Sequence, residues 1–376
     1  MGTVKILHCA DLHIGASSAS IGERGATRKT EALLTFEKAI DLCQEQGVNI
    51  MLISGDLFCS NDIPRSYVSR VIECIEKLGS TEVVFAAGNH DPLNSQSPFN
   101  SVKLPSNFHI LPTYNSVITF ENLGVKVYGR SFPEVYLEGE RRFPLTADPD
   151  YINIMCQHGE LRSDLSSNYN SITPEFIENS GMDYIALGHI HKRSEPAKRG
   201  QTYFAYSGCT QGLGFDELGV KGVYIGDIGK GICDLEFYKT SVRTHEVLNF
   251  TVDGICNEAE LCEKILSGLQ TKYGETFADN LYKIVLNGTV SQNDVIDTDQ
   301  IAERLMQTVY FAKVIDRTQL GEDLEVLSRE KSLKGIFVSK MLERINSAEE
   351  GEKEKLLSAL KLGLKAFVSE VNFNGD

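Results

Sequence analysis

The chain has 376 residues, of which 41% are hydrophobic and 24% are charged, and its formal net charge is −15. This length excludes a single small domain, the composition is that of a folded globular protein, and no run reaches the roughly 18 apolar residues that a membrane span needs. The acidic charge disfavours, without excluding, a protein that binds nucleic acid over a broad basic surface.

The first hundred residues alternate between strand and helix patterns. Apolar, β-prone runs predict three buried strands, at 4–9, 48–54 and 83–87. Helical periods lie between them, at 28–46 and 65–78. Each helix is stopped by a glycine, Gly47 or Gly79. This β-α-β-α-β order predicts a parallel sheet covered by helices.

From about 107 to 240 the pattern changes to strands and turns. Two hairpins are predicted, at 117–129 and 223–238. Two more buried strands, at 152–156 and 184–187, enclose a helix at 173–179. Together with the first hundred residues, these elements predict an α/β fold in which two sheets pack face to face with flanking helices outside.

A boundary is expected near 243–250, after which a small α/β unit follows. Its expected elements are strand 245–252, helix 257–270, strand 282–288, helix 298–308 and strand 309–316. The last fifty or so residues lack strand patterns and predict two amphipathic helices split by the polar stretch 347–352. Their apolar stripes are Leu333, Phe337, Met341 and Ile345, then Leu356, Leu360, Leu364, Phe367 and Val371 with Leu357 and Val368. Such stripes either pack against each other and the cap or dock a partner.

Five short polar clusters lie at or just beyond the C-terminal ends of predicted strands. They are Asp11-Leu12-His13, Gly55-Asp56, Gly88-Asn89-His90-Asp91, His158-Gly159 and Gly188-His189-Ile190-His191. Strand ends of an open α/β sheet deliver side chains to one crevice. Carboxylate, amide and imidazole donors without a thiolate suit Mn²⁺, Fe²⁺, Mg²⁺ or Zn²⁺. The clusters therefore predict a metal site.

Each cluster taken alone has an ordinary explanation. An aspartate after a glycine is usually part of a turn, and a single histidine is usually structural. The coincidence of five clusters at five strand ends favours the metal site. We expect His8 to lie in the core or behind the ligands, and His109 and His245 to be surface or packing residues. The nine cysteines form no C-x-x-C pair, which favours reduced thiols in a cytoplasmic protein.

The five clusters resemble the motif set of the calcineurin-like metallophosphoesterases: D-x-H, G-D, G-N-H-D/E, H and G-H-x-H. The sequences D-L-H-I-G at 11–15 and S-G-D-L-F at 54–58, with the stretch 206–222, are similar to the SbcD-type DNA repair exonucleases. The resemblance implies a metallophosphoesterase (nuclease) domain over 1–243, a capping domain over 244–320 and C-terminal amphipathic helices over 321–376. Two departures are Cys59, where many relatives have an acidic or polar residue, and Cys209, where serine is common.

The resemblance also implies two divalent ions, Mn²⁺ first, with Mg²⁺, Fe²⁺ and Zn²⁺ as alternatives. It assigns Asp11, His13 and His191 to one ion. It assigns Asn89, His158 and His189 to the other ion, and Asp56 as a ligand that bridges both. It makes His90 the catalytic histidine, oriented by Asp91. Two such ions about 4 Å apart would activate a bridging water to hydroxide for attack on phosphorus, while His90 assists the leaving group.

The predicted function is that of a hydrolase, a metal-dependent DNA exonuclease or endonuclease in DNA repair. Two alternatives remain: a small-molecule or cyclic-nucleotide phosphodiesterase on the same core, and a non-catalytic subunit that docks an ATPase. The resemblance implies DNA and an SMC-like (SbcC-type) ATPase as partners, leaves a homodimer open and implies no membrane. Candidate phosphate contacts, with ordinary surface charge as the alternative, are Arg141, Arg142, Lys192, Arg193, Lys198 and Arg199.

Overall fold

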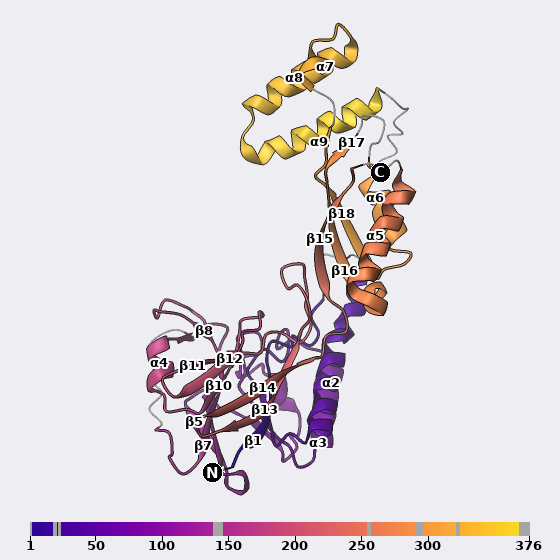
Figure 1. The fold of residues 1–376 in the computed structure, drawn as a ribbon. Helices are drawn as coiled ribbons and strands as arrows, with labels where there is room; N and C mark the ends of the chain where they lie inside the picture. Colours follow the sequence, from indigo (N-terminus) through magenta and orange to yellow (C-terminus); the bar gives the residue numbers. More distant parts are fainter. Residues whose placement is uncertain are drawn as a thin grey trace. The chain divides into compact units, whose positions relative to one another are not determined.

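The structure is a computed structural model that describes residues 2–17, 21, 24–137, 146–253, 257–290, 296–320 and 324–367. The chain divides into two compact units, Met1–Thr244 and His245–Asp376 (Figure 1). Each unit has sheets and apolar clusters of its own. The assignment of 1–243, 244–320 and 321–376 to three domains stays a prediction.

The first sheet of the first unit has six strands in the order β14-β13-β1-β2-β3-β4. Their bounds are β1 Val4–Cys9, β2 Ile50–Ile53, β3 Glu82–Phe85, β4 Phe108–Ile110, β13 Gly222–Gly229 and β14 Ile232–Lys239. Strands β1 to β4 run parallel, while β13 is antiparallel to both β1 and β14. Helices α2 (Glu31–Gln46) and α3 (Arg65–Lys77) connect β1 to β2 and β2 to β3. The predicted parallel sheet is confirmed, and β4 is an addition to it.

The second sheet also has six strands, in the order β11-β12-β10-β7-β6-β5. Their bounds are β5 Ser116–Phe120, β6 Val125–Arg130, β7 Ile152–His158, β10 Tyr184–Gly188, β11 Ala197–Arg199 and β12 Thr202–Tyr206. The four central strands are parallel, and the edge strands β5 and β11 are antiparallel to their neighbours. Shorter elements are α1 Arg24–Thr27, α4 Pro174–Asn179, β8 Glu160–Leu161 and β9 Ser171–Ile172.

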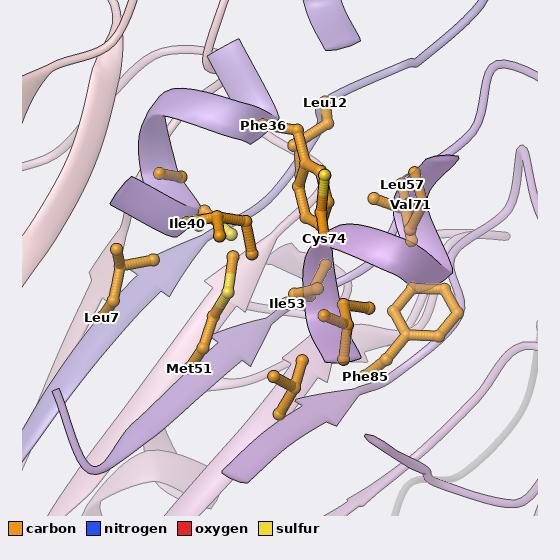
Figure 2. Packing of buried hydrophobic residues seen from close by; sticks show 14 of the residues in the cluster. Leu7, Leu12, Phe36, Ile40, Met51, Ile53, Leu57, Val71, Cys74 and Phe85 are labelled. Carbon is orange, nitrogen blue, oxygen red and sulfur yellow. The ribbon is translucent and has the colours of Figure 1, made fainter. Parts of the chain in front are cut away.

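The alternation of side chains along the central strands explains why the sheets form a sandwich. In β2, Ile50 and Leu52 pack into the cluster that the two sheets share, whereas Met51 and Ile53 belong to the cluster under the helices. Figure 2 shows Met51 and Ile53 below Phe36 and Ile40 of α2. All four residues of β2 are fully buried. The predicted α/β fold with two packed sheets and flanking helices is therefore confirmed.

The second unit contains a parallel sheet of three strands in the order β15-β16-β18. Its elements are β15 His245–Thr251, α5 Glu258–Tyr273, β16 Leu281–Asn287, β17 Thr289–Val290, α6 Thr298–Leu305, β18 Phe311–Asp316 and β19 Gln319–Leu320. Both longer helices begin at side-chain caps, because Asn257 and Asp297 accept backbone N–H groups of the first turn. The predicted alternation of strands and helices is confirmed.

Three helices end the described chain: α7 Leu324–Ser328, α8 Leu333–Ser347 and α9 Glu350–Ala366. Met341 and Ile345 of α8 pack with Leu360 and Leu364 of α9 in one apolar cluster. Of the two alternatives for the predicted stripes, mutual packing therefore holds for these residues. Val368 and Val371 lie outside the described residues. None of the helices that the structure describes has the length and apolar character to cross a membrane.

Candidate metal centre

The five polar clusters lie at or just beyond the C-terminal ends of β1, β2, β3, β7 and β10, three strands of one sheet and two of the other. The turns after β1 and β2 are hydrogen-bonded to each other, since Asp11 N donates to Gly55 O and His13 N to Asp56 O, both at 3.0 Å. Two glycines allow the remaining loops to approach. A Cβ on Gly88 would lie 2.1 Å from Asp56 Oδ1, and one on Gly188 would lie 1.8 Å from Ser54 O.

Backbone strain is concentrated at the same place. The described non-glycine residues with positive φ are Asp11, His13, Asp56, Asn170 and His189. Four of these five are predicted ligands, and the fifth, Asn170, donates from Nδ2 to the carbonyl of the predicted ligand His158 at 2.7 Å. Left-handed backbone at such residues costs about 1–3 kcal/mol each and persists only where the surroundings impose it, as they do at functional sites.

The structure brings all seven predicted ligands together. On one side, His13 Nε2 lies 3.0 Å from His191 Nε2, which is 4.0 Å from Asp11 Oδ1. On the other side, Asn89 Oδ1 lies 3.0 Å from His158 Nε2 and 3.2 Å from His189 Nδ1. Asp56 Oδ2 is between the two groups, 3.8 Å from His13 Nε2 and 3.5 Å from His158 Nε2. This is the position that a bridging carboxylate requires.

The chemistry of these donors fits cations. His158 Nδ1 donates to the carbonyl of Ser54 at 2.8 Å, so in the neutral ring Nε2 carries a lone pair. Burial lowers the pKa of His158 to about 3, which keeps the ring neutral. Its lone pair therefore faces Asn89 Oδ1, another acceptor, at 3.0 Å. Two acceptors at this separation repel each other unless a cation lies at both.

The buried carboxylates indicate the same. Asp11 and Asp56 are each 1% exposed. Burial raises the pKa of Asp11 to about 8 and that of Asp56 to about 6, because a negative charge is poorly solvated there. Divalent cations would stabilise the ionised forms, as they do wherever they are the largest local charges.

His90 has an exposed side chain at the edge of this donor cluster. Its backbone N–H donates to Asp56 Oδ1 at 2.9 Å, and its ring lies edge-on to that of His13, with centroids 4.8 Å apart. The orientation of His90 by Asp91 stays a prediction. Asp91 accepts the backbone N–H groups of Phe58 and Gly88, at 3.0 and 2.8 Å. These two hydrogen bonds link the loop after β2 to the loop after β3. The His90 ring places Nδ1 3.3 Å from the carbonyl of Cys59.

One further residue of the site was not predicted. Glu217 Oε1 accepts a hydrogen bond from His191 Nδ1, and Glu217 Oε2 accepts one from Leu213 N at 2.7 Å. Burial alone would raise the pKa of Glu217, but these hydrogen bonds hold it below its usual value. The available signal was the stretch 206–222, which the resemblance singled out without giving any of its residues a role.

The comparisons with known proteins agree with this geometry. The model of the calcineurin-like phosphoesterase family matches residues 4–193, about half of the chain and all five clusters. The chain belongs to this family. It is therefore a phosphoesterase of a family of hydrolases that use divalent metals, and its donor cluster is a candidate metal centre.

Three curated proteins show how far the similarity extends. This phosphoesterase is 30% identical to an uncharacterized metallophosphoesterase, YhaO, of Bacillus subtilis over 64% of this chain and 60% of that protein. It is 22% identical to DNA double-strand break repair protein Mre11 of Methanopyrus kandleri over 70% and 63%. It is also 22% identical to the Mre11 of Saccharolobus solfataricus over 95% and 94%. The chain thus spans less than two thirds of the first two relatives.

The candidate phosphate contacts of the phosphoesterase fall into three groups. Arg141 and Arg142 lie outside the described residues. Arg193 is engaged within the fold, with its guanidinium 4.3 Å from the ring centroid of Phe237 and 3.0 Å from Glu195. Lys192, Lys198 and Arg199 are exposed. Lys192 also lines a cavity of about 120 Å³ that reaches His191.

The remaining histidines are accounted for by packing. His8 is fully buried in the first unit, with Nδ1 2.8 Å from the Tyr184 hydroxyl and Nε2 3.1 Å from the Leu187 carbonyl. His109 pairs with Glu82 at 2.7 Å, and His245 is buried. The expectation that none of them is a ligand agrees with these contacts.

Proposed function

We propose that this phosphoesterase cleaves phosphodiester bonds of DNA at a centre of two divalent ions. The observation that supports the two-ion centre is the division of the donors into two groups of three, with Asp56 Oδ2 3.5–3.8 Å from a histidine of each. Asp11, His13 and His191 would hold one ion, and Asn89, His158 and His189 would hold the other. Bound there, the ions would supply Lewis-acid polarisation of the phosphate and a nucleophile at neutral pH.

His90 is the residue that we assign to the leaving group. Its backbone is fixed by the hydrogen bond to Asp56, while its ring is exposed at the edge of the centre. The carbonyl of Cys59 accepts the proton of Nδ1, so the proton for the departing oxygen must come from Nε2, which carries one only when the ring is the imidazolium. Asp91 would orient this ring through the backbone of the loop, where it accepts the N–H of Gly88.

DNA is supported as the substrate by sequence similarity and by the exposed basic residues. The sequences at 11–15, 54–58 and 206–222 resemble SbcD-type exonucleases, and two relatives are named as DNA double-strand break repair proteins. Lys192 is exposed next to the predicted ligand His191 and lines a cavity with it, and Lys198 and Arg199 are exposed in β11.

The test compares end-labelled single- and double-stranded DNA with bis(p-nitrophenyl) phosphate and cyclic nucleotides, each with Mn²⁺ and with Mg²⁺. We expect metal-dependent shortening of the DNA by the wild-type chain and its loss in His90→Asn. Turnover of the small diesters alone would instead support the alternative phosphodiesterase. Turnover of no substrate would contradict the proposal.

We also propose that the C-terminal helices dock an SMC-like ATPase, through exposed apolar residues at the start of α8. Met341, Ile345, Leu360 and Leu364 of the predicted stripes are buried between α8 and α9, but Leu333 of the same stripe is 74% exposed and Ile336, one turn later, is 55% exposed. Exposed apolar side chains in such a group indicate a binding surface. Co-expression with an SbcC-type ATPase tests this. Replacing both by serine should abolish co-purification, while serine at Leu34, 48% exposed in the first unit, should not.

A further inference from the structure

The loop between β12 and β13 presents a carboxylate to the back of one predicted metal ligand. Glu217 Oε1 accepts the proton of His191 Nδ1, and its side chain is only 12% exposed. The other oxygen is held by Leu213 N at 2.7 Å and lies 3.9 Å from Cys209 Sγ. Both carboxylate oxygens therefore have partners within the fold.

This contact fixes which nitrogen of His191 faces the donor cluster. An ionised carboxylate can only accept, so the hydrogen of the neutral ring must be on Nδ1. The lone pair is then on Nε2, the atom that lies 3.0 Å from His13 Nε2 and 4.0 Å from Asp11 Oδ1. His158 is oriented in a weaker way, because its Nδ1 donates to the neutral carbonyl of Ser54.

The loop cannot easily move this carboxylate away from His191, because three hydrogen bonds to backbone groups hold the loop in place. Cys209 N donates to the carbonyl of His191 at 3.1 Å. Arg28, only 1% exposed, donates to the carbonyl of Gly212 at 2.6 Å. Thr240 Oγ1 donates to the carbonyl of Thr210 at 3.1 Å. The stretch 206–222 thus forms a fixed support behind His191.

We propose that Glu217 is a positioning residue that sets the affinity of the ion held by Asp11, His13 and His191, and not of the ion at Asn89, His158 and His189. The inference rests on the proposed two-ion centre. A carboxylate behind a ligating imidazole fixes its tautomer and orientation and makes the ligand more basic, and loss of such a partner typically lowers metal affinity about 10–100-fold.

The test is a Mn²⁺ titration of the full chain, followed by calorimetry and by the EPR signal of free Mn²⁺. We expect two equivalents in the wild type. In Glu217→Ala one of them should bind about 10–100-fold more weakly, with the other within about twofold. Glu217→Gln should lose less, because its amide oxygen can still accept the Nδ1 proton. Asp216→Asn is the matched control, since it removes the same charge from an exposed position of the same loop.

A second readout reports the tautomer directly. In the metal-free wild type at alkaline pH, where the imidazole of His191 is neutral, its ¹⁵N shifts should show a protonated Nδ1, and in Glu217→Ala they should show a mixture of tautomers. Unchanged affinities and shifts in both Glu217 variants would overturn the inference. Equal weakening of both ions with a lower melting temperature would also overturn it, because Glu217 would then be a structural residue. A wild type that binds fewer than two ions would contradict the proposed function itself.

Discussion

The two units bury different kinds of side chains. Every buried aspartate, glutamate, lysine and arginine that the structure describes lies in the first unit, among them Asp11 and Asp56 of the donor cluster and the nearby Asp91. The described core of the second unit is built mainly from leucine, isoleucine and valine, with few polar groups such as Asn280 and Thr318. Burying a carboxylate costs several kcal/mol unless it is paired, so the first unit gives up stability that the second keeps.

Backbone strain follows the same division, since all five described non-glycine residues with positive φ belong to the first unit. Two unfavourable features, buried carboxylates and positive φ at non-glycine residues, therefore occur together where five strand ends meet. The comparison indicates that the buried polar residues of the first unit serve the candidate metal centre, whereas the interior of the second unit serves packing alone. Substitutions can test this division, because they should separate activity from stability.

The largest effect is expected for Asp56→Asn. Loss of the carboxylate shared by the two donor groups should lower phosphodiester turnover about 10⁴-fold, since metal ions contribute several kcal/mol of transition-state stabilisation. The metal-free protein should be no less stable, because burial disfavours the Asp56 charge and asparagine can still accept the N–H of His90. Kinetics with Mn²⁺ and calorimetry in EDTA measure the two quantities. A clear drop in metal-free stability would break the comparison.

The next effect is expected for His90→Asn. Turnover should fall about 10²–10⁴-fold, the usual contribution of general acid–base assistance, while Mn²⁺ binding stays within about twofold. Stability should change by less than about 0.5 kcal/mol, because the side chain is exposed. Loss of metal together with activity would make His90 a ligand and remove it from the assigned role.

These two residues also show what could be predicted from the sequence. The polar clusters could be found because each lies at the end of an apolar run within a short contiguous motif, and the resemblance to the family's motif set then implied the ligands within them. The partners of these residues could not be found, because they come from distant loops: the backbone carbonyl of Cys59 lies near the ring of His90, and Glu217 contacts His191 across 26 residues.

The fold shows the same limit in two short edge strands. Strands β4 and β11 have three residues each and too few side chains to reveal a period of two. They form because longer neighbours, β3 and β12, supply a template for their backbone hydrogen bonds. In the C-terminal helices, the apolar period predicted the helices and the residues through which α8 and α9 pack, but it could not show that Leu333 of the same stripe stays exposed.

Leu364→Ala should change stability and leave activity unchanged, the reverse of the first two variants. This side chain is 1% exposed in the cluster between α8 and α9, so its truncation should lower the unfolding free energy of the second unit by about 2–5 kcal/mol. Metal-dependent turnover of bis(p-nitrophenyl) phosphate should not change. Calorimetry and the same kinetic assay measure both quantities. Leu362→Ala, at a position 51% exposed on the same helix, should change neither.

The smallest effect is expected when Lys192 and Lys198 are both replaced by glutamine. Each lysine that contacts a phosphate should lower the slope of log K against log[salt] by about one when it is removed. The measurement is DNA binding in Ca²⁺, which occupies oxygen ligands, across several salt concentrations. Turnover of the small diester should stay at the wild-type value, because neither side chain belongs to the donor cluster.

A variant that loses a positive charge in the second unit is the control for the change in salt slope. Lys264→Gln removes one exposed ammonium group that already pairs with Glu260 at 2.9 Å, so it should leave the salt slope unchanged. If the double variant behaves like Lys264→Gln, the basic residues near the centre are ordinary surface charge, and DNA meets the phosphoesterase elsewhere. If the slope falls by about two while the small diester is still cleaved, Lys192 and Lys198 are contacts that only a long phosphate backbone can use. Such a result would extend the functional part of the first unit from its strained interior to its surface.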